Sequence, residues 1–192
     1  ALSKITKYDI EYLDNHDTYI EVLSKRRNEI DFVFNLCDEG FMNKARYELH
    51  VPALLEMLGI PYSGSNPQCL AYCYDKSLVR GIAKELDIPV AKGFFLKPHD
   101  NTMELNITFP VIVKPNFGDS SIGITVKSVC YSPEELLNSV VDIKNKFGYC
   151  NSILVEEFLV GADLSLGVIG NVGENMLILP ITEEDYSEVP ED

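Results

Sequence analysis

A lysine followed by a loop rich in glycine and serine is the feature of this sequence best suited to chemistry. Lys114 ends a short apolar run, and the loop Gly118-Asp-Ser-Ser-Ile-Gly123 follows it. Glycines let a backbone turn several N–H groups toward a ligand, and such a concavity suits phosphate oxygens. Lys114 is a compact cation that could reach the same anion, and Ser120 and Ser121 add hydroxyl donors. We interpret the stretch as a lid over nucleotide phosphates.

The same stretch also fits an ordinary β-hairpin whose strand-end lysine extends into solvent. Asp119 adds a negative charge to the loop, which opposes anion binding unless a cation lies nearby. A Walker A loop is excluded because Lys114 precedes the glycines, and a Rossmann fingerprint because no helix is predicted to follow.

A second lysine stands where a helix dipole disfavours it. Asp75 and Lys76 open a predicted helix that continues to about Leu86, and positive charge is unfavourable in a first helical turn. Either the mismatch has no functional meaning, or Lys76 serves an anion supplied from outside the helix.

Composition narrows the class of protein and its partners. The 192 residues carry a formal net charge of −14, 46% hydrophobic residues and a mean hydropathy of +0.00. These values are typical of a globular protein and oppose nucleic-acid or anionic-membrane partners, which require basic surfaces. No apolar run is long enough to span a membrane, and the N-terminus lacks a signal-peptide pattern. Five cysteines without a CxxC pair favour free thiols, so we expect a cytoplasmic location.

Hydrophobic periodicity and capping residues predict alternating helices and strands. Gly59 should end one helix, Asn66 should cap the next, and Ser132-Pro-Glu-Glu135 should open another through a capping box. The predicted helices are residues 17–29, 51–58, 66–74, 75–86 and 132–147. The predicted strands are residues 31–36, 61–64, 91–96, 111–113, 124–126 and 152–159, followed by a hairpin of 162–169 with 174–179. In the helix over 132–147, the predicted buried face is Leu136, Leu137, Val140, Val141 and Phe147.

The order of these pieces resembles the ATP-grasp superfamily, and within it the D-alanine–D-alanine ligase group. The blocks that carry the resemblance are residues 55–65, Asp75-Lys76, 87–90, 109–115, 120–123 and 155–159. The implied fold class is α/β, an incomplete ATP-grasp fold with a partial pre-ATP-grasp (Rossmann-like) domain. The implied domains are residues 1–65 for that partial domain, 66–155 for the central ATP-binding subdomain and 156–192 for the start of the C-terminal subdomain.

The resemblance also implies roles for individual residues. Lys76 and Lys114 match the two lysines that bind ATP phosphates in the family. Ser120, Ser121 and Gly123 match the family's lid over those phosphates, and Ser120 is the expected catalytic residue. The adenine hinge matches Glu156, Glu157, Phe158 and Leu159. Asp163 stands where the family has a glutamate for the ribose hydroxyls. Without the resemblance, Glu156 and Glu157 would be a solvated strand end and Asp163 a solvated turn.

The family reaction joins a carboxylate to an amine through an acyl phosphate made from ATP, with Mg²⁺ and lysines neutralising charge. The implied partners are therefore ATP and a small carboxylate or amino-acid substrate, without nucleic acid or membrane, and a homodimer is compatible with them. We expect the ligands of Mg²⁺ to lie beyond Asp192 and assign none here, so this chain by itself is expected to be inactive. Residues 37–40, Cys-Asp-Glu-Gly, replace the His-Gly of dipeptide ligases, which questions D-alanine as the substrate. The alternative function is a nucleotide-binding or regulatory module on an ATP-grasp scaffold without ligase chemistry.

Overall fold

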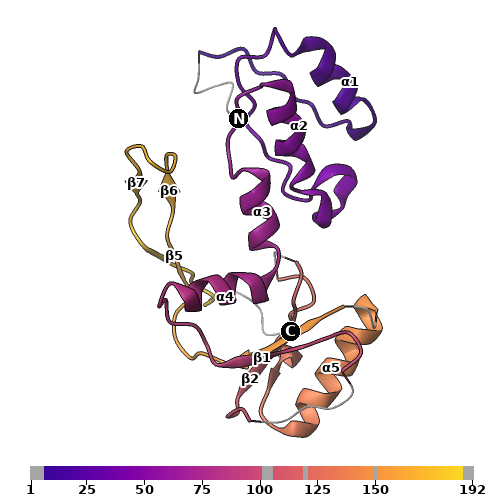
Figure 1. Cartoon of the computed structure of the whole chain (residues 1–192), viewed down its shortest axis with the longest axis vertical. Coiled ribbons are helices and arrows are strands. Elements are labelled where there is room, and N and C mark those ends of the chain that lie inside the picture. The colour runs from indigo at the N-terminus through magenta and orange to yellow at the C-terminus, as the bar shows by residue number, and fades with distance from the viewer. Residues whose placement is uncertain (1–6, 101–105, 119–120, 149–150, 188–192) are drawn as a thin grey trace. The chain divides into compact units, whose positions relative to one another are not determined.

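The computed structural model of the chain describes residues 7–100, 106–118, 121–148 and 151–187. The chain divides into two compact units, residues 1–157 and residues 158–192, which we describe separately. Figure 1 labels the elements of both units along the chain.

The first part of unit 1 is helical. Four α-helices follow one another: α1 (His16–Arg26), α2 (His50–Leu58), α3 (Pro67–Cys73) and α4 (Lys76–Glu85), with the short 3-10 helices η2 (Phe41–Asn43) and η3 (Ala45–Tyr47) before α2. Side chains cap three of them as N-caps, because Asn15, Asn66 and Asp75 accept hydrogen bonds from backbone N–H groups of the first turn. Gly59 ends α2 in the left-handed conformation, which confirms its predicted role.

A four-stranded antiparallel sheet forms the second part of unit 1. Its strands are β1 (Gly93–Leu96), β2 (Val111–Pro115), β3 (Val129–Cys130) and β4 (Ile153–Glu157), in the order β1-β4-β2-β3. Helix α5 (Pro133–Phe147) joins β3 to β4, and the 3-10 helix η4 (Val126–Ser128) precedes β3. The long connection through α5 therefore places β4 in the middle of the sheet, between β1 and β2.

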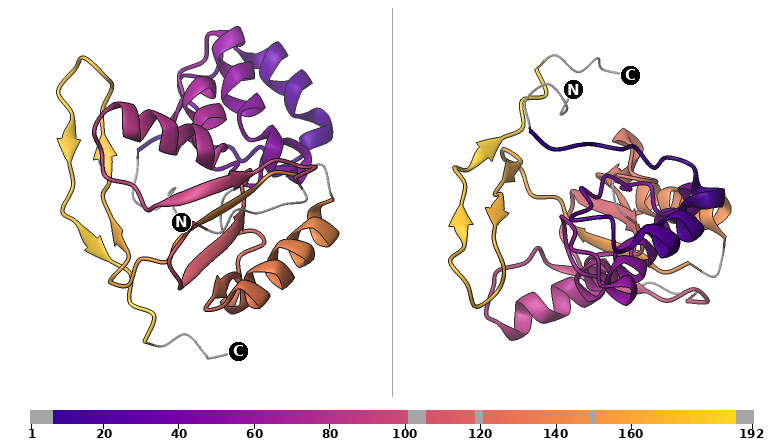
Figure 2. Two further views of the ribbon diagram at one scale, coloured as in Figure 1. Left: turned by 60° about the horizontal axis from the view of Figure 1, so that its bottom comes forward. Right: turned by 90° about the horizontal axis from the view of Figure 1, so that it is seen from above.

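The two faces of this sheet differ in chemistry. One face packs against α5, because Val111, Val113, Ile153 and Val155 share a buried core with Leu136, Val140 and Ile143. Side chains alternate along a strand, so the opposite face carries those of Ile112 and Lys114 from β2 and of Leu154 and Glu156 from β4. Helix α4 lies on that second face, as the left view of Figure 2 shows.

A second, smaller core holds the N-terminal helices together. It contains Leu23 of α1 with Val51 and Leu55 of α2 and Ile60, all at most 3% exposed. Both cores are typical of amphipathic elements that bury one apolar face.

Unit 2 is built from short antiparallel strands. Strand β5 (Leu164–Ser165) pairs with β8 (Thr182–Glu183), and β6 (Val168–Ile169) pairs with β7 (Leu177–Ile178). The predicted hairpin is thus confirmed, with an additional pairing that involves the residues after Ile181. Residues 159–187 are all exposed.

Four predictions about the elements were wrong. Neither residues 31–36 nor residues 61–64 form a strand, because only a single parallel bridge joins Val33 to Tyr62. Phe32 and Phe34 are 55% and 58% exposed, so the predicted burial of residues 31–36 is wrong for both. Residues 124–126 are not a strand either, because a 3-10 turn capped by Thr125 intervenes and the strand begins at Val129. In α5, Leu137 and Val141 face solvent because the buried stripe runs through Leu136, Ser139, Val140 and Ile143, three or four residues apart.

The capping box predicted at the start of α5 is shifted by one residue. Ser132 accepts a hydrogen bond from the Glu135 N–H, as predicted, but Glu135 Oε2 accepts from the N–H of Tyr131 at 2.7 Å. The cap is therefore present with a different reciprocal partner.

Candidate nucleotide site

Three charged side chains meet on the face of the sheet opposite α5. Glu156 of β4 lies between two cations, with Oε1 3.2 Å from Lys114 Nζ and Oε2 3.5 Å from Arg80 Nη1. All three are largely buried, with exposed side-chain fractions of 12% for Glu156, 13% for Arg80 and 21% for Lys114. Burying ions is costly unless they are paired. We call Arg80, Lys114 and Glu156 the charge cluster.

The two oxygens of the Glu156 carboxylate differ. Oε2 is buried without a hydrogen-bond partner among the described residues, because Arg80 approaches it within ion-pair distance but outside hydrogen-bond geometry. A buried acceptor that lacks a hydrogen bond carries a cost of about 1–3 kcal/mol. The only compensation for burying Oε2 among the described residues is the nearby charge of Arg80.

The backbone of β1 restricts where Glu156 can lie. Gly93 is directly opposite Glu156 in the sheet, and a Cβ at position 93 would come within 2.7 Å of the Glu156 Cβ and 2.4 Å of the Val155 carbonyl oxygen. Only glycine allows this close approach.

Helix α4 is fixed to the end of β2 through Asp75 and Asn116. Asp75 Oδ1 accepts hydrogen bonds from Asn116 Nδ2 and Ser77 Oγ, each at 2.8 Å, and from the Leu78 N–H at 3.0 Å. Asn116 is fully buried, and its Oδ1 accepts from the Ser77 N–H while its carbonyl accepts from the Lys76 N–H. These bonds place the first turn of α4 directly beyond Lys114.

This network changes the acidity of Asp75. Burial alone would raise the pKa of its carboxyl group, but the hydrogen bonds from Asn116, Ser77 and Leu78 outweigh it and lower the pKa below the ordinary 3.8. Asp75 is thus held as a carboxylate at the junction between helix and sheet.

The two predicted phosphate lysines lie at the same end of β2. Lys114 belongs to the strand, and Lys76 Nζ donates to the carbonyl of Gly118, four residues further on. Positions 76 and 80 face the same side of α4, because residues four apart share a helix face. Arg80 in turn reaches Glu156, the partner of Lys114. Lys114 and Arg80 therefore meet at Glu156, and Lys76 lies one helical turn before Arg80.

The predicted lid is only partly described. Ser120 lies outside the described residues, whereas Ser121 is exposed with a φ of 57° and opens a turn in which Ser121 O accepts from the Ile124 N–H. Gly123 has a φ of 81°, and a Cβ there would come within 2.6 Å of the Phe147 ring. Close packing against α5 therefore requires glycine at position 123, a requirement that the sequence alone did not indicate.

The predicted hinge residues fall on both sides of the division between units. Glu157 ends β4, and its N–H donates to the carbonyl of Lys92 at 2.7 Å. Phe158, Leu159 and Asp163 belong to unit 2. Within unit 2, Asp163 Oδ2 accepts from the Tyr186 hydroxyl at 2.9 Å, and this bond raises the pKa of Tyr186.

Sequence reasoning missed Arg80 and Asn116. Arg80 follows Lys76 by four residues, and this helical spacing was a usable signal for a second cation on the same face. Asn116 follows the predicted strand directly but had no motif of its own. Its role became visible only with its buried contacts to α4.

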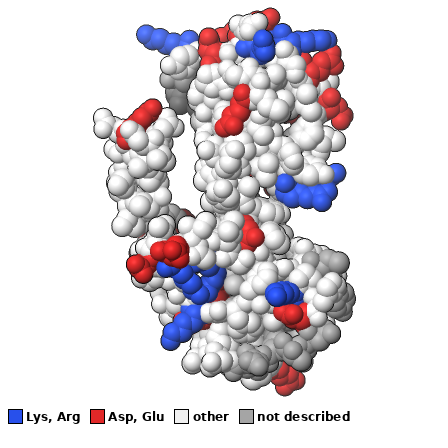
Figure 3. All heavy atoms as spheres, viewed as in Figure 1, with Lys and Arg blue, Asp and Glu red and all other residues white. Residues whose placement is uncertain are grey.

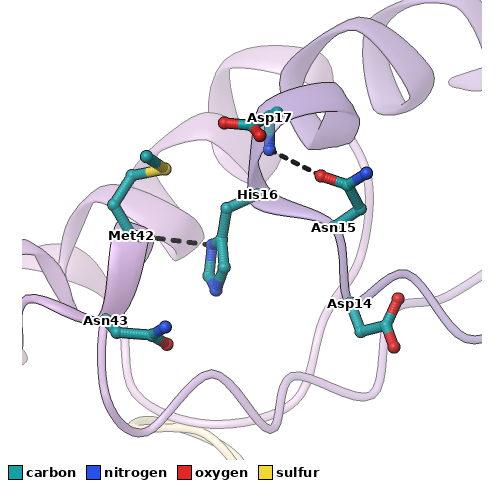
Figure 4. A pocket seen from close by; sticks show the side chains of 6 residues that line it. All are labelled: Asp14, Asn15, His16, Asp17, Met42 and Asn43. Atoms are coloured by element: carbon teal, nitrogen blue, oxygen red, sulfur yellow. Dashed lines mark hydrogen bonds between the residues drawn. The ribbon is translucent and has the colours of Figure 1, made fainter.

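A hollow of about 430 Å³ lies elsewhere, between the start of α1 and η2 (Figure 4). Its lining includes Asp14, Asp17 and His16, whose Nδ1 accepts from the Met42 N–H at 3.2 Å. The two acidic side chains oppose an anionic ligand, so we do not assign the nucleotide to this hollow. By contrast, the charged atoms around α4 in Figure 3 include both basic and acidic side chains.

Comparison with known proteins identifies the class of fold. The structure of D-alanine–D-alanine ligase from Bacillus anthracis complexed with ATP matches with a TM-score of 0.61 and 24% identity, covering 92% of this chain and 54% of that one. The VanG D-Ala:D-Ser ligase from Enterococcus faecalis matches with a TM-score of 0.59 and 26% identity, over 70% of this chain and 38% of that one. The chain thus has the ATP-grasp fold.

Within this fold class, the chain can also be assigned to a particular family. Residues 82–188 match the family described as D-ala D-ala ligase C-terminus, and this chain belongs to that family. The D-alanine–D-alanine ligase of Halalkalibacterium halodurans is 35% identical over 162 residues, which cover 82% of this chain and 50% of that protein. The chain spans about half the length of the curated relatives that it matches over most of its own length.

The described residues contain neither a candidate membrane span nor a candidate metal site. No helix there is long and apolar enough to cross a bilayer. No group of three or more His, Cys, Asp or Glu side chains in those residues could hold a metal ion, so no ligand of Mg²⁺ is assigned among them.

Proposed function

We propose that this chain is the nucleotide-binding part of an ATP-dependent carboxylate–amine ligase related to D-alanine–D-alanine ligase. The observation that carries the proposal is the charge cluster on the face of an ATP-grasp sheet opposite α5, in a chain that belongs to the D-ala D-ala ligase C-terminus family. Related ligases named for D-Ala and D-Ser acceptors support a small amino-acid substrate. The product is an amide, formed through an acyl phosphate in a cytoplasmic enzyme.

Each proposed site residue has a task set by its chemistry. Lys76 and Lys114 neutralise ATP phosphates, because ammonium groups at the end of β2 supply positive charge where the protein as a whole is acidic. Glu156 contacts the adenine base, the role that the family resemblance implies for it. The remaining assignments are Ser120, Ser121 and Gly123 in the lid, Glu157, Phe158 and Leu159 at the base, and Asp163 at the ribose.

Removing the charge of Lys114 tests nucleotide binding. We expect Lys114→Met to weaken ATP binding roughly tenfold or more, because a hydrogen bond to a charged group contributes about 1.5–3 kcal/mol. The measurement is an ATP titration by calorimetry with and without Mg²⁺. Lys127→Met is the matched control, since it removes the same charge from an exposed residue of η4. Unchanged ATP affinity in Lys114→Met would contradict the proposed site.

Ligase chemistry needs a separate assay. The protein is mixed with ATP, Mg²⁺ and pairs drawn from D-alanine and D-serine, and ADP and dipeptide are both followed. We expect ADP release that depends on the amino acids and matches the amide formed. ADP release without any coupled product would instead favour a nucleotide-binding module without ligation.

A further inference from the structure

We propose that Asn116 is a positioning residue for phosphate binding, because it fixes the first turn of α4, and with it Lys76, against the strand that carries Lys114. The inference rests on the proposed function and adds to it a residue that has no motif of its own in the sequence. It follows from the burial of Asn116 and from the hydrogen bonds that this residue makes.

Every polar group of Asn116 is bonded within unit 1. Its N–H donates to the Ser152 carbonyl at 3.0 Å, which continues the pairing of β2 with the chain that leads into β4. Its carbonyl accepts from the Lys76 N–H at 3.1 Å. Its side chain donates to the Asp75 carboxylate at 2.8 Å and accepts from the Ser77 N–H at 2.9 Å, so both ends of the amide are used. Asn116 is fully buried, so it holds α4 to the sheet away from competing water.

This network occupies the backbone donors at the start of α4. The N–H groups of Lys76 and Ser77 donate to Asn116. The N–H of Leu78 donates to the Asp75 carboxylate at 3.0 Å. A helix N-terminus binds anions through N–H groups that are still free, whereas these three are bonded to protein acceptors. At this end of α4, the group suited to a phosphate is therefore the Lys76 ammonium.

Asn116 also relates the two proposed phosphate lysines to each other. Residues 114 and 116 are two apart in extended chain, so their side chains lie on the same face of the sheet. Asn116 thus attaches the start of α4 to the face that carries Lys114. On the side of the helix, Lys76 Nζ donates to the carbonyl of Gly118, where the predicted lid begins. One buried side chain therefore joins the two elements that carry the lysines.

Loss of this side chain should disturb Lys76 without removing the pairing of the backbone. Two backbone bonds remain between the segments, from the Lys76 N–H to the carbonyl of residue 116 and from the Gly118 N–H to the Tyr74 carbonyl. Ser77 and Asp75 each lose a partner, so the first turn of α4 is no longer held in one position. The Lys76 ammonium is then less well preorganised for a phosphate, and binding weakens.

The experiment is a double-mutant cycle on ATP binding. Dissociation constants of ATP in the presence of Mg²⁺ are measured by calorimetry for wild-type chain, Asn116→Ala, Lys76→Met and the double variant. Asn116→Leu, a second substitution of similar volume to asparagine, is measured in the same two backgrounds. Asn28→Leu is the control, because Asn28 is an exposed residue in the turn after α1. Circular dichroism reports whether each variant is folded.

We expect Asn116→Ala and Asn116→Leu each to weaken ATP binding about threefold to tenfold, because the displaced ammonium loses part of a charged hydrogen bond. Lys76→Met should weaken it about tenfold or more, since that contact is then absent. In the Lys76→Met chain, substitution of Asn116 should change the affinity by less than about twofold, because the group that it positions is gone. Asn28→Leu should bind ATP as wild-type chain does. A merely structural role for Asn116 would weaken binding by the same factor in both backgrounds.

Several results would overturn this inference and leave the proposed function standing, provided that wild-type chain binds ATP. They are an equal effect of the Asn116 substitutions with and without Lys76, no effect of either substitution, and unchanged affinity in Lys76→Met. Failure of both Asn116 variants to fold would also overturn it, since Asn116 would then serve folding as a whole. If wild-type chain does not bind ATP, the proposed function falls and this inference falls with it.

Discussion

At the scale of residues, Glu156 illustrates how burial and charge compensation act together. A lone carboxylate that is 12% exposed would be costly, and removing one partner of a buried ion pair typically destabilises a protein by about 3–5 kcal/mol. Two cations share Glu156, so the loss of either one leaves the other in place. The charge of Arg80 thus partly compensates for the missing hydrogen bond at the buried Oε2.

The acidity of Asp75 leads to a prediction about pH. Its pKa in the folded chain is lowered below the ordinary 3.8, so near that pH the unfolded chain binds more protons than the folded one. The stabilisation is therefore complete above the ordinary pKa and is lost as the pH falls through the lowered value. We expect Asp75→Asn to reduce the free energy of unfolding by roughly 1 kcal/mol at pH 7, because a neutral oxygen accepts weaker hydrogen bonds.

The difference between wild type and Asp75→Asn should shrink between pH 5 and pH 3, as measured by urea unfolding followed by circular dichroism. Asparagine is itself a good N-cap, so the variant keeps the cap of α4 and tests mainly the charge. Asp38→Asn changes an exposed loop carboxylate and serves as the control. A difference that is equal at all pH values would show that the charge of Asp75 does not contribute.

At the scale of elements, the predictions succeeded where a local pattern sets the structure. Asn66, Asp75 and Ser132 cap helices as their sequence positions indicated, since a side-chain cap depends on residues only two or three positions away. The strand predicted over residues 31–36 is absent, because strand formation depends on pairing partners elsewhere in the chain that a local pattern does not reveal. The charge cluster was half predictable, because Lys114 and Glu156 lie in motifs but their contact with Arg80 depends on how α4 packs.

We expect the substitution of glycine by alanine to change the free energy of unfolding in opposite directions at two positions. Gly81 lies within α4, and a Cβ at that position would meet nothing within 4 Å. We expect Gly81→Ala to raise the free energy of unfolding by about 0.5–1 kcal/mol, because alanine loses less conformational entropy in a helix. Gly93→Ala should lower it by about 1–3 kcal/mol, because its Cβ would lie 2.4 Å from the Val155 carbonyl oxygen.

Both free energies are measured by chemical unfolding of the single variants beside wild type. Gly81→Ala is the control for Gly93→Ala, since each adds one methyl group. If Gly93→Ala proves as stable as wild type, the close approach of β1 to Glu156 is not rigid. Contact with β1 would then not restrict the movement of Glu156.

At the scale of the whole molecule, the two units differ in how they are stabilised. Unit 1 has two buried cores, one beneath the sheet and one between α1 and α2. In unit 2, residues 159–187 are all exposed, and each strand pair has only two residues on each side. Isolated two-stranded hairpins are at best marginally stable in water, because they bury little apolar area.

This contrast predicts the pattern of amide hydrogen exchange in the whole chain. Local opening requires little free energy where few apolar contacts are broken, so amides of β6 and β7 should exchange orders of magnitude faster than those of β4, which lies in the middle of the sheet. Exchange is measured by mass spectrometry at two protein concentrations. Val168, Ile169, Leu177 and Ile178 expose apolar side chains, so association of chains would protect them at the higher concentration only. Equal protection of β4 and β6 at both concentrations would mean that unit 2 is as well packed as unit 1, contrary to its exposed side chains.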